Sequence, residues 1–241
     1  MLYKTRGIVL KTTGYKSSSV ITQVFTEKFG LQSYLINGVR KSGSKVPYNV
    51  LQPLHLLEMV VYYKNSASLQ RVKEIRNSPV FFHIPLDVTK STVCLFLCEV
   101  LYKTLRRQSG EDPALFEYIA SSMELLDHHE GSIGNFHLLF LMGLTRHLGF
   151  YPDARDPDGN YFDLQNGRFL EKAPSHPWYI GPGLTGCWRK LIHARYEELS
   201  ELRIGSGDRR QLLRTLLDYY NLHIEGFGSV RSYEVLQELF S

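Results

Sequence analysis

Apolar and polar residues alternate over the first 80 positions, in short runs that turn-forming residues separate. The runs lie at residues 5–12, 20–26, 31–36, 54–63 and 68–75. A period of two is typical of strands that bury one face, and Gly14 and Gly30 are placed to turn the chain between them. Five short strands within about 75 residues predict a small closed β-barrel.

Beyond Pro85 the apolar residues recur every three or four positions, which is the period of an amphipathic helix. Helices are predicted at residues 89–108, 113–127, 135–148, 187–199, 205–222 and 233–240. Pro113 suits the first turn of its helix, and Asp208 is a candidate N-cap. Polar residues and prolines at 77–86 separate the two patterns. The sequence therefore predicts an α+β protein, with a β-domain at 1–80 and an all-α domain at 81–241.

An irregular insert at residues 150–186 interrupts the predicted helices. It contains two apolar-aromatic arms, Tyr161–Leu170, that meet at Asn166-Gly167. Asn-Gly between such arms is a strong indication of a hairpin turn, because both residues tolerate positive φ. We therefore predict a small β-hairpin in this insert.

Positive charge is concentrated in the predicted barrel. Residues 1–80 carry 12 Lys and Arg and 3 acids, a net charge of +9, whereas the other 161 residues carry 16 basic and 21 acidic side chains, a net charge of −5. A small β-domain with this charge attracts polyanions, and nucleic acid is the leading candidate. A merely lysine-rich solvated surface is the alternative.

Basic residues in turns and on one predicted strand are the candidates for contacts with a nucleic-acid backbone. The candidates are Arg40, Lys41, Lys45, Arg71, Lys73, Arg76, Lys11 and Lys16. The first three lie in a loop at 38–47, whose small residues permit close approach to phosphates. Arg71 and Lys73 are two apart on a strand and therefore share a face. Contacts of this kind give affinity without sequence preference.

Aromatic residues among these basic ones are candidates for stacking on unpaired bases. Tyr15 is the favoured one, because it adjoins Gly14 and Lys16 in a predicted turn. The others are Tyr34, Tyr48 and Phe25. An aromatic residue in a strand more often belongs to the core, so exposure decides between the two roles.

No arrangement of residues points to catalytic or cofactor chemistry. Gly181–Gly186 matches G-x-G-x-x-G, but Pro182 offers no N–H to a phosphate and helices flank it, so a flexible turn is expected there. Cys94 and Cys98 are four apart on an apolar helix and are expected in the core. The aspartates at 153–158 fail the register of a calcium loop. We predict a non-enzymatic protein without a metal or cofactor.

Length, apolar runs and cysteine content narrow the class of protein further. At 241 residues with 43% hydrophobic content, the chain suits one large or two small folded domains. No apolar run approaches the 18 residues of a membrane span, and the N-terminus begins with charge rather than an export signal. Three cysteines fit a reducing cytoplasm, which is the expected location.

Four segments of the chain are more specific in their order and spacing than any single motif. They are Gly7–Gly30 (GIVLKTTGYKSSSVITQVFTEKFG), Gly38–Lys45 (GVRKSGSK), Leu51–Glu58 (LQPLHLLE) and Leu148–Pro152 (LGFYP). Together they resemble the bacterial DNA repair protein RecO family, closely in the predicted barrel and loosely in the helical part.

The resemblance implies an N-terminal OB-fold barrel, a C-terminal helical domain, and binding of single- and double-stranded DNA with annealing of complementary strands. It also implies work with RecR and single-stranded-DNA-binding protein to load RecA at gaps. Many members carry a four-cysteine zinc site after the Leu-Gly-aromatic segment. Residues 150–186 of this chain contain no cysteine, so we expect no zinc, with the Asn166-Gly167 hairpin holding the region together instead.

The resulting prediction is a cytoplasmic, nucleoid-associated DNA repair and recombination mediator of the RecF pathway. In the helical domain, Arg106-Arg107 and Arg209-Arg210 are either contacts for partner proteins or merely solvated side chains. Two alternatives stay open. One is an OB-fold protein that binds RNA, and the other is a metal-dependent nuclease that uses the aspartates of the insert.

Overall fold

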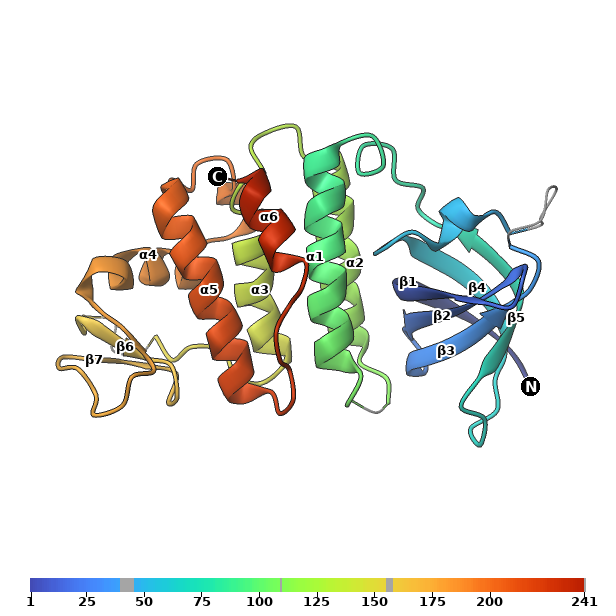
Figure 1. Cartoon of the computed structure of the whole chain (residues 1–241), viewed down its shortest axis with the longest axis horizontal. Coiled ribbons are helices and arrows are strands. Elements are labelled where there is room, and N and C mark those ends of the chain that lie inside the picture. Colours follow the sequence, from blue (N-terminus) through green and yellow to red (C-terminus); the bar gives the residue numbers. More distant parts are fainter. Residues whose placement is uncertain (40–45, 109, 155–157, 241) are drawn as a thin grey trace. The chain divides into compact units, whose positions relative to one another are not determined.

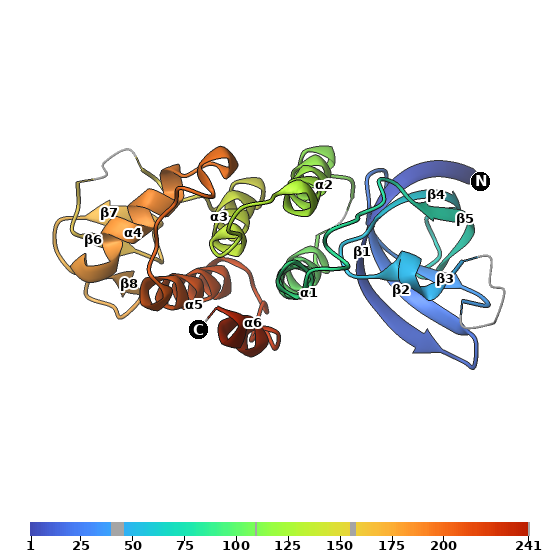
Figure 2. The ribbon, with the colours of Figure 1, turned by 90° about the horizontal axis from the view of Figure 1, so that it is seen from above.

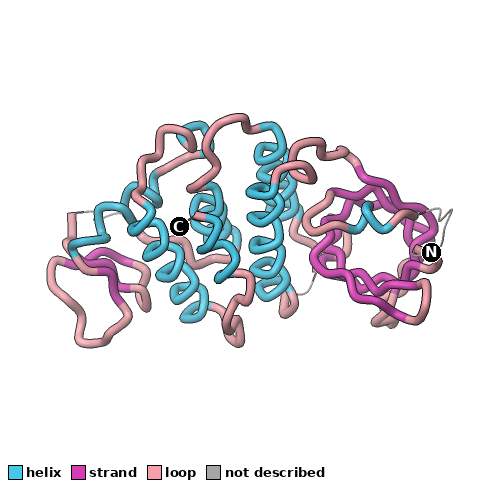
Figure 3. The backbone as a smooth tube through the Cα atoms, turned by 45° about the horizontal axis from the view of Figure 1, so that its top comes forward, coloured by secondary structure: helices cyan, strands magenta, loops and turns pink. Residues whose placement is uncertain are grey.

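The computed structural model describes residues 1–39, 46–108, 110–154 and 158–240. It begins with a closed five-stranded barrel, in the order β1-β2-β3-β5-β4 (Figures 1 and 3). The strands are β1 (Leu2–Tyr15), β2 (Ser19–Thr26), β3 (Gly30–Ile36), β4 (Leu56–Tyr62) and β5 (Gln70–Asn77), and a 3₁₀ helix, η1 (Tyr48–Leu51), precedes β4. All neighbours are antiparallel except β3 and β5. The five predicted strands and the OB-fold barrel are confirmed.

The inner faces of the strands fill the barrel with the alternate apolar residues that predicted them. The fully buried members include Val9, Val24 and Tyr34, together with Met59 and Val61 of β4. A close approach explains one glycine: a β-carbon at Gly7 would lie 2.5 Å from Val24 Cγ1. Any larger residue at this position would push β1 away from β2.

Helices α1 (Val88–Leu105) and α2 (Pro113–His128) form one compact unit with the barrel, and residues 230–236 also belong to it (Figure 2). Helices α1 and α2 cover the outer side of β1 and β2 at one end (Figure 2). Phe25 lies 6.0 Å from Phe116 between ring centroids, and Cys98 Sγ donates a 2.7 Å hydrogen bond to the carbonyl oxygen of Leu10. Cys94 and Cys98 are buried, as predicted, and burial raises the pKa of both thiols. The division predicted between 1–80 and 81–241 stays a prediction.

A buried carboxylate near the end of α2 holds the segment that leads from the barrel into α1. Asp127 accepts backbone N–H bonds from Phe82, His83 and Ile84 at 3.0, 2.8 and 2.7 Å. Lys90, on the first turn of α1, donates to the carbonyl oxygen of Asp127 at 2.9 Å. Burial alone would raise the pKa of Asp127, but these three N–H donors outweigh it and the net pKa lies below its ordinary value.

The second compact unit comprises residues 129–229 and 237–240 of the described chain. Its helices are α3 (Phe136–His147), α4 (Pro182–His193) and α5 (Ser206–His223), with a 3₁₀ turn, η2 (Tyr196–Glu198), between the last two; α6 (Tyr233–Leu239) follows. All the predicted helices are present. Within the described part of the chain, every helix is too short or too polar to cross a membrane.

Two helix starts differ from the prediction. The glycine-rich segment 181–186 is the first turn of α4 rather than a flexible turn, with Gly181 at the N-cap and Pro182 at the first helical position. Burial of Leu184, Trp188 and Leu191 on one face outweighs the low helix propensity of glycine. Asp208 lies in the first turn of α5, whose N-cap is Gly205. Its negative charge there still interacts favourably with the positive end of the helix dipole.

The predicted hairpin is confirmed as β6 (Tyr161–Asp163) and β7 (Arg168–Leu170), and a short strand that was not predicted, β8 (Tyr179–Ile180), pairs with β6. Gly167 has a φ of +63° at the turn, which suits glycine. Asp163 ties the turn together by accepting bonds from Gln165 N, Asn166 N and Asn166 Nδ2 at 2.9, 3.1 and 2.7 Å. The buried face of this sheet packs on Trp188, 5.2 Å from Phe162 between ring centroids.

Candidate nucleic-acid interface

The outer surface of the barrel divides into two parts of different charge. The first part, called the acid-free face below, spans the second half of β1, then β2, β3 and the start of β5. Its outward-facing residues are Lys11, Thr13, Tyr15, Ile21, Gln23, Ser33, Leu35 and Arg71. The register sets them in rows, such as Thr13–Ile21–Leu35–Arg71. None of these described residues is acidic.

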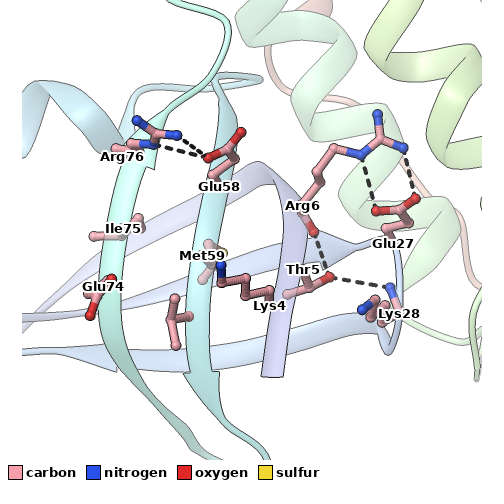
Figure 4. A pocket seen from close by; sticks show the side chains of 11 residues that line it. Lys4, Thr5, Arg6, Glu27, Lys28, Glu58, Met59, Glu74, Ile75 and Arg76 are labelled. Carbon is pink, nitrogen blue, oxygen red and sulfur yellow. Dashed lines mark hydrogen bonds and ion pairs between the residues drawn. The ribbon is translucent and has the colours of Figure 1, made fainter. Parts of the chain in front are cut away.

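The second part is a hollow of about 550 Å³ across β1, β4 and β5, called the mixed-charge hollow (Figure 4). Its charged lining consists of Lys4, Arg6, Glu27, Lys28, Glu58, Glu74 and Arg76. All three acids of residues 1–80 are in this set. Four bases against three acids leave a net charge of +1, so this part of the barrel attracts polyanions weakly.

Ion pairs occupy much of the positive charge in the mixed-charge hollow. Arg6 Nη2 lies 2.8 Å from Glu27 Oε1, and Arg76 Nη2 lies 2.5 Å from Glu58 Oε2 (Figure 4). Arg6 also pairs with Glu117 of α2. Hydrogen bonds from Arg6 lower the pKa of Glu27, and the same bonds raise the pKa of Arg6. The Glu27 carboxylate is therefore ionised at neutral pH and repels phosphates.

The predicted backbone-binding residues fall on both parts of the surface. Lys11 and Arg71 lie on the acid-free face, and Lys16 lies in the turn at its edge. Lys73 Nζ pairs with Glu74 at 3.4 Å, and Arg76 pairs with Glu58. The first three have no acidic partner within ion-pair distance among the described residues. Arg40, Lys41 and Lys45 lie outside the described residues.

The structure separates the predicted stacking residues by exposure. Tyr34 is in the barrel core, and Phe25 is buried against α2, so neither presents a face to a base. Both therefore take the core role that the sequence favours for an aromatic residue in a strand. Tyr15 and Tyr48 are exposed.

The turn between β1 and β2 presents an aromatic ring and a cation together. Lys16 has a φ of +53°, in the left-handed region that a lysine seldom adopts, and its Nζ lies 5.5 Å from the centroid of the Tyr15 ring. The connection between β4 and β5, with Lys64, leads to Arg71. In an OB-fold, the β2–β3 face and these two connections are where oligonucleotides bind. The arrangement can neutralise phosphates on the acid-free face and stack a base at Tyr15.

The sequence pattern missed the ion pairs that neutralise the mixed-charge hollow. Arg6 meets Glu27 because β1 pairs with β2, and Arg76 meets Glu58 because β4 pairs with β5 in this register. The alternation of each strand shows that these residues face outward, but it does not show which strands are neighbours.

The described residues give little support for a metal site or a nucleophilic cysteine. No group of three or more His, Cys, Asp or Glu side chains among them is arranged to hold a metal ion. Cys187 Sγ lies 3.6 Å from Asp208 Oδ2, and burial is the main cause that raises the pKa of this thiol. A thiol in this state is a poor nucleophile.

Comparison with known proteins agrees with this architecture over nearly the whole chain. Residues 1–78 match the family model described as Recombination protein O N terminal, and residues 85–232 match Recombination protein O C terminal. The chain belongs to the RecO family. Curated relatives in this family include the DNA repair protein RecO of Bacteroides fragilis, 38% identical, that of Phocaeicola vulgatus, 36% identical, and that of Azobacteroides pseudotrichonymphae, 34% identical. Each alignment covers 100% of this chain and 100% of the relative.

The predicted RecO resemblance is therefore confirmed, and with it the assignment to a family of DNA repair proteins. Both family models start and end close to elements described above: the first covers the barrel, and the second begins just before α1.

Proposed function

We propose that this RecO-family chain is a non-enzymatic mediator of DNA repair and recombination, which binds single- and double-stranded DNA and anneals complementary strands. One observation carries the proposal: all three acids of the barrel segment lie in the mixed-charge hollow, so the acid-free face keeps its positive charge. The segregation gives a +9 segment a defined side for a polyanion rather than a diffuse field.

In this proposal the DNA backbone follows the acid-free face. Lys16 and Arg71 are its central contacts, Lys11 lies further along β1, and Arg40, Lys41 and Lys45 add contacts from the connection after β3. Lys73 and Arg76 contribute less, because each already pairs with a carboxylate. These side chains meet phosphates rather than base edges, so binding has no sequence preference and leaves the bases available for pairing.

Annealing follows from charge neutralisation. Two complementary strands repel each other, and a protein that screens this repulsion raises the rate at which they meet. Phosphate contacts also release condensed counterions. If about five phosphates are neutralised, log K for single strands falls with log salt at a slope of about −3.5.

The partners of this activity are RecR and single-stranded-DNA-binding protein, with RecA acting downstream on gaps. We place the protein in the cytoplasm on nucleoid DNA. No cofactor takes part. The helices after the barrel supply surfaces for partner proteins.

The proposal is tested by the annealing of two labelled complementary strands, pre-coated with single-stranded-DNA-binding protein, without ATP or metal. We expect this protein to accelerate duplex formation, and the double variant Arg40→Glu/Lys41→Glu to slow it. DNA binding without annealing would refute the mediator activity. Loss of full-length strands on addition of magnesium would instead indicate a nuclease, and preference for RNA over DNA of equal length would indicate an RNA-binding protein.

Tyr15 provides a separate test of how single strands bind. We expect Tyr15→Ala to weaken binding of a single strand by about 1–3 kcal/mol, because a base stacks on the ring. Tyr15→Phe keeps the ring and should bind normally. Tyr179→Ala is a matched control, since Tyr15 and Tyr179 are 39% and 38% exposed. Equal losses in Tyr15→Phe and Tyr15→Ala, measured by fluorescence anisotropy, would show that the hydroxyl rather than stacking matters.

A further inference from the structure

A hollow of about 230 Å³ opens where the chain before β4 lies against the middle of β1. Lys11 and Thr12 of β1 line one side of it, and Tyr48, Leu51 and Gln52 line the other. The hydroxyl of Thr12 donates a 3.3 Å hydrogen bond to the carbonyl oxygen of Leu51, which joins the two sides. This cavity is called the Tyr48 hollow below.

A β-bulge in β1 makes room for the Tyr48 hollow. The pairing of β1 with β2 shifts register between Val9 and Lys11, and β1 pairs with β4 only as far as Ile8. A bulge bends its strand and ends pairing along one edge. From Lys11 on, that edge of β1 therefore faces residues 48–53 instead of a strand. A strand edge without a partner strand presents N–H and C=O groups, which are available to a polar ligand.

The side chains of the Tyr48 hollow combine a cation, an aromatic ring and an amide. Lys11 Nζ lies 4.9 Å from the centroid of the Tyr102 ring, a contact that orients the ammonium group without neutralising it. Tyr48 is 44% exposed, so its ring is open to a ligand. The amide of Gln52 offers both donors and an acceptor. These three groups match the phosphate, the face and the edge of a nucleotide.

Position and size identify which nucleotide fits. Lys11 belongs to both the acid-free face and the Tyr48 hollow, so a DNA strand bound on that face reaches the hollow without a break. The volume lies below the range of about 300–1,000 Å³ that is usual for drug-sized ligands, and it suits a single base. A base in a duplex is paired and stacked, and it cannot enter a pocket unless it leaves the helix. The ligand that fits is therefore one unpaired base of a single strand.

We propose that the Tyr48 hollow binds one unpaired base of single-stranded DNA, which stacks on Tyr48 and hydrogen-bonds to Gln52 while its phosphate meets Lys11. This inference rests on the proposed DNA binding and adds to it a site that distinguishes single strands from duplexes. The acid-free face meets the backbone of both. The hollow also lies outside the β2–β3 face and the two connections at which OB-folds usually bind oligonucleotides.

Photo-crosslinking and two affinities test the base site on the full chain. A short oligothymidylate that carries one 5-bromodeoxyuridine is bound and irradiated, and mass spectrometry locates the crosslinked residue. Fluorescence anisotropy then gives the Kd for a single strand and for a duplex, in the wild type, Tyr48→Ala and Gln52→Ala. Tyr179→Ala is the matched control, because Tyr179 is 38% exposed and lies outside the hollow. Circular dichroism shows that each variant is folded.

We expect a crosslink at Tyr48 and a loss of single-strand affinity of about fivefold or more in Tyr48→Ala, because the stacked base loses its ring. Gln52→Ala keeps the ring and should lose only about two- to fivefold. Duplex affinity should change by less than about twofold in both variants, since paired bases stay out of the hollow. Equal losses for single strands and duplexes, or crosslinks at Tyr15 without any at Tyr48, would overturn the base site.

Failure of the base site and failure of the proposed function give different results. If the wild type binds neither single strands nor duplexes, the proposed function itself is refuted. If Lys16→Glu/Arg71→Glu weakens single-strand binding but Tyr48→Ala behaves like Tyr179→Ala, DNA binding on the acid-free face stands and only the base site is overturned.

Discussion

Reversing two charges on the acid-free face, in Lys16→Glu/Arg71→Glu, is expected to weaken the binding of single-stranded DNA by roughly 100-fold at low salt. Each reversal changes the charge by two units, and a unit charge about 4 Å from a phosphate is worth about 1 kcal/mol in water, less after screening by salt. If both residues contact phosphates, the slope of log K against log salt should become less negative by about 1.4, or about 0.7 for each lost contact.

The control for this experiment has the same change in net charge elsewhere on the barrel. Lys4 and Lys28 are both exposed and line the mixed-charge hollow. We expect Lys4→Glu/Lys28→Glu to lower affinity by only a fewfold, through the net charge of the whole domain, and to leave the salt slope nearly unchanged. Equal losses in the two double variants, measured by anisotropy over a salt series, would show that DNA binding follows net charge and not the acid-free face.

The sequence predicted the barrel and the helices because their positions depend on local patterns. Each strand alternates over enough residues to expose its period, and helix α1 repeats apolar residues at three- and four-residue spacing over 18 residues. The hairpin at Gly167 was equally predictable, since Asn-Gly favours one kind of turn. The short strand β8 has only two residues, too few to show a period.

The candidate site was only partly predictable, because its electrostatics depend on which strands are neighbours. The excess of basic residues is visible in the sequence, but the confinement of Glu27, Glu58 and Glu74 to one hollow follows from barrel closure. The burial of Tyr34 and Phe25 likewise depends on the core and on α2. Alternation placed Tyr34 and Phe25 on opposite faces of the sheet, and only the docked helix shows that both faces are covered there.

The largest loss of stability is expected at Asp127, whose carboxylate joins the end of α2 to the segment before α1. Asp127→Ala removes the acceptor of three backbone N–H groups, of which that of Ile84 is buried and those of Phe82 and His83 are part-buried. Hydrogen bonds to a charged group are worth about 1.5–3 kcal/mol each, and their effects are not additive, so we expect a loss of roughly 3–5 kcal/mol. Asp127→Asn keeps one acceptor oxygen and should lose about half as much. Urea unfolding followed by circular dichroism measures both.

Asp112→Ala is the control for Asp127, because this carboxylate accepts a single N–H, that of Leu115 at 2.9 Å, at the start of α2. Loss of one such cap costs about 1 kcal/mol. If Asp127→Ala costs no more than Asp112→Ala, the three N–H groups find other partners and Asp127 does not hold the connecting segment.

The contribution of Asp127 should also depend on pH in a definite direction. Its pKa in the folded protein lies below the ordinary value of 3.8, so the folded state favours the ionised carboxylate more than the unfolded state does. The stabilisation is complete above pH values of about 5 and is lost as the pH falls through the folded pKa. The difference in unfolding free energy between wild type and Asp127→Asn should therefore shrink steadily below pH 4. A difference that stays constant down to acid unfolding would mean that the stabilisation comes from the shape of the side chain and not from its charge.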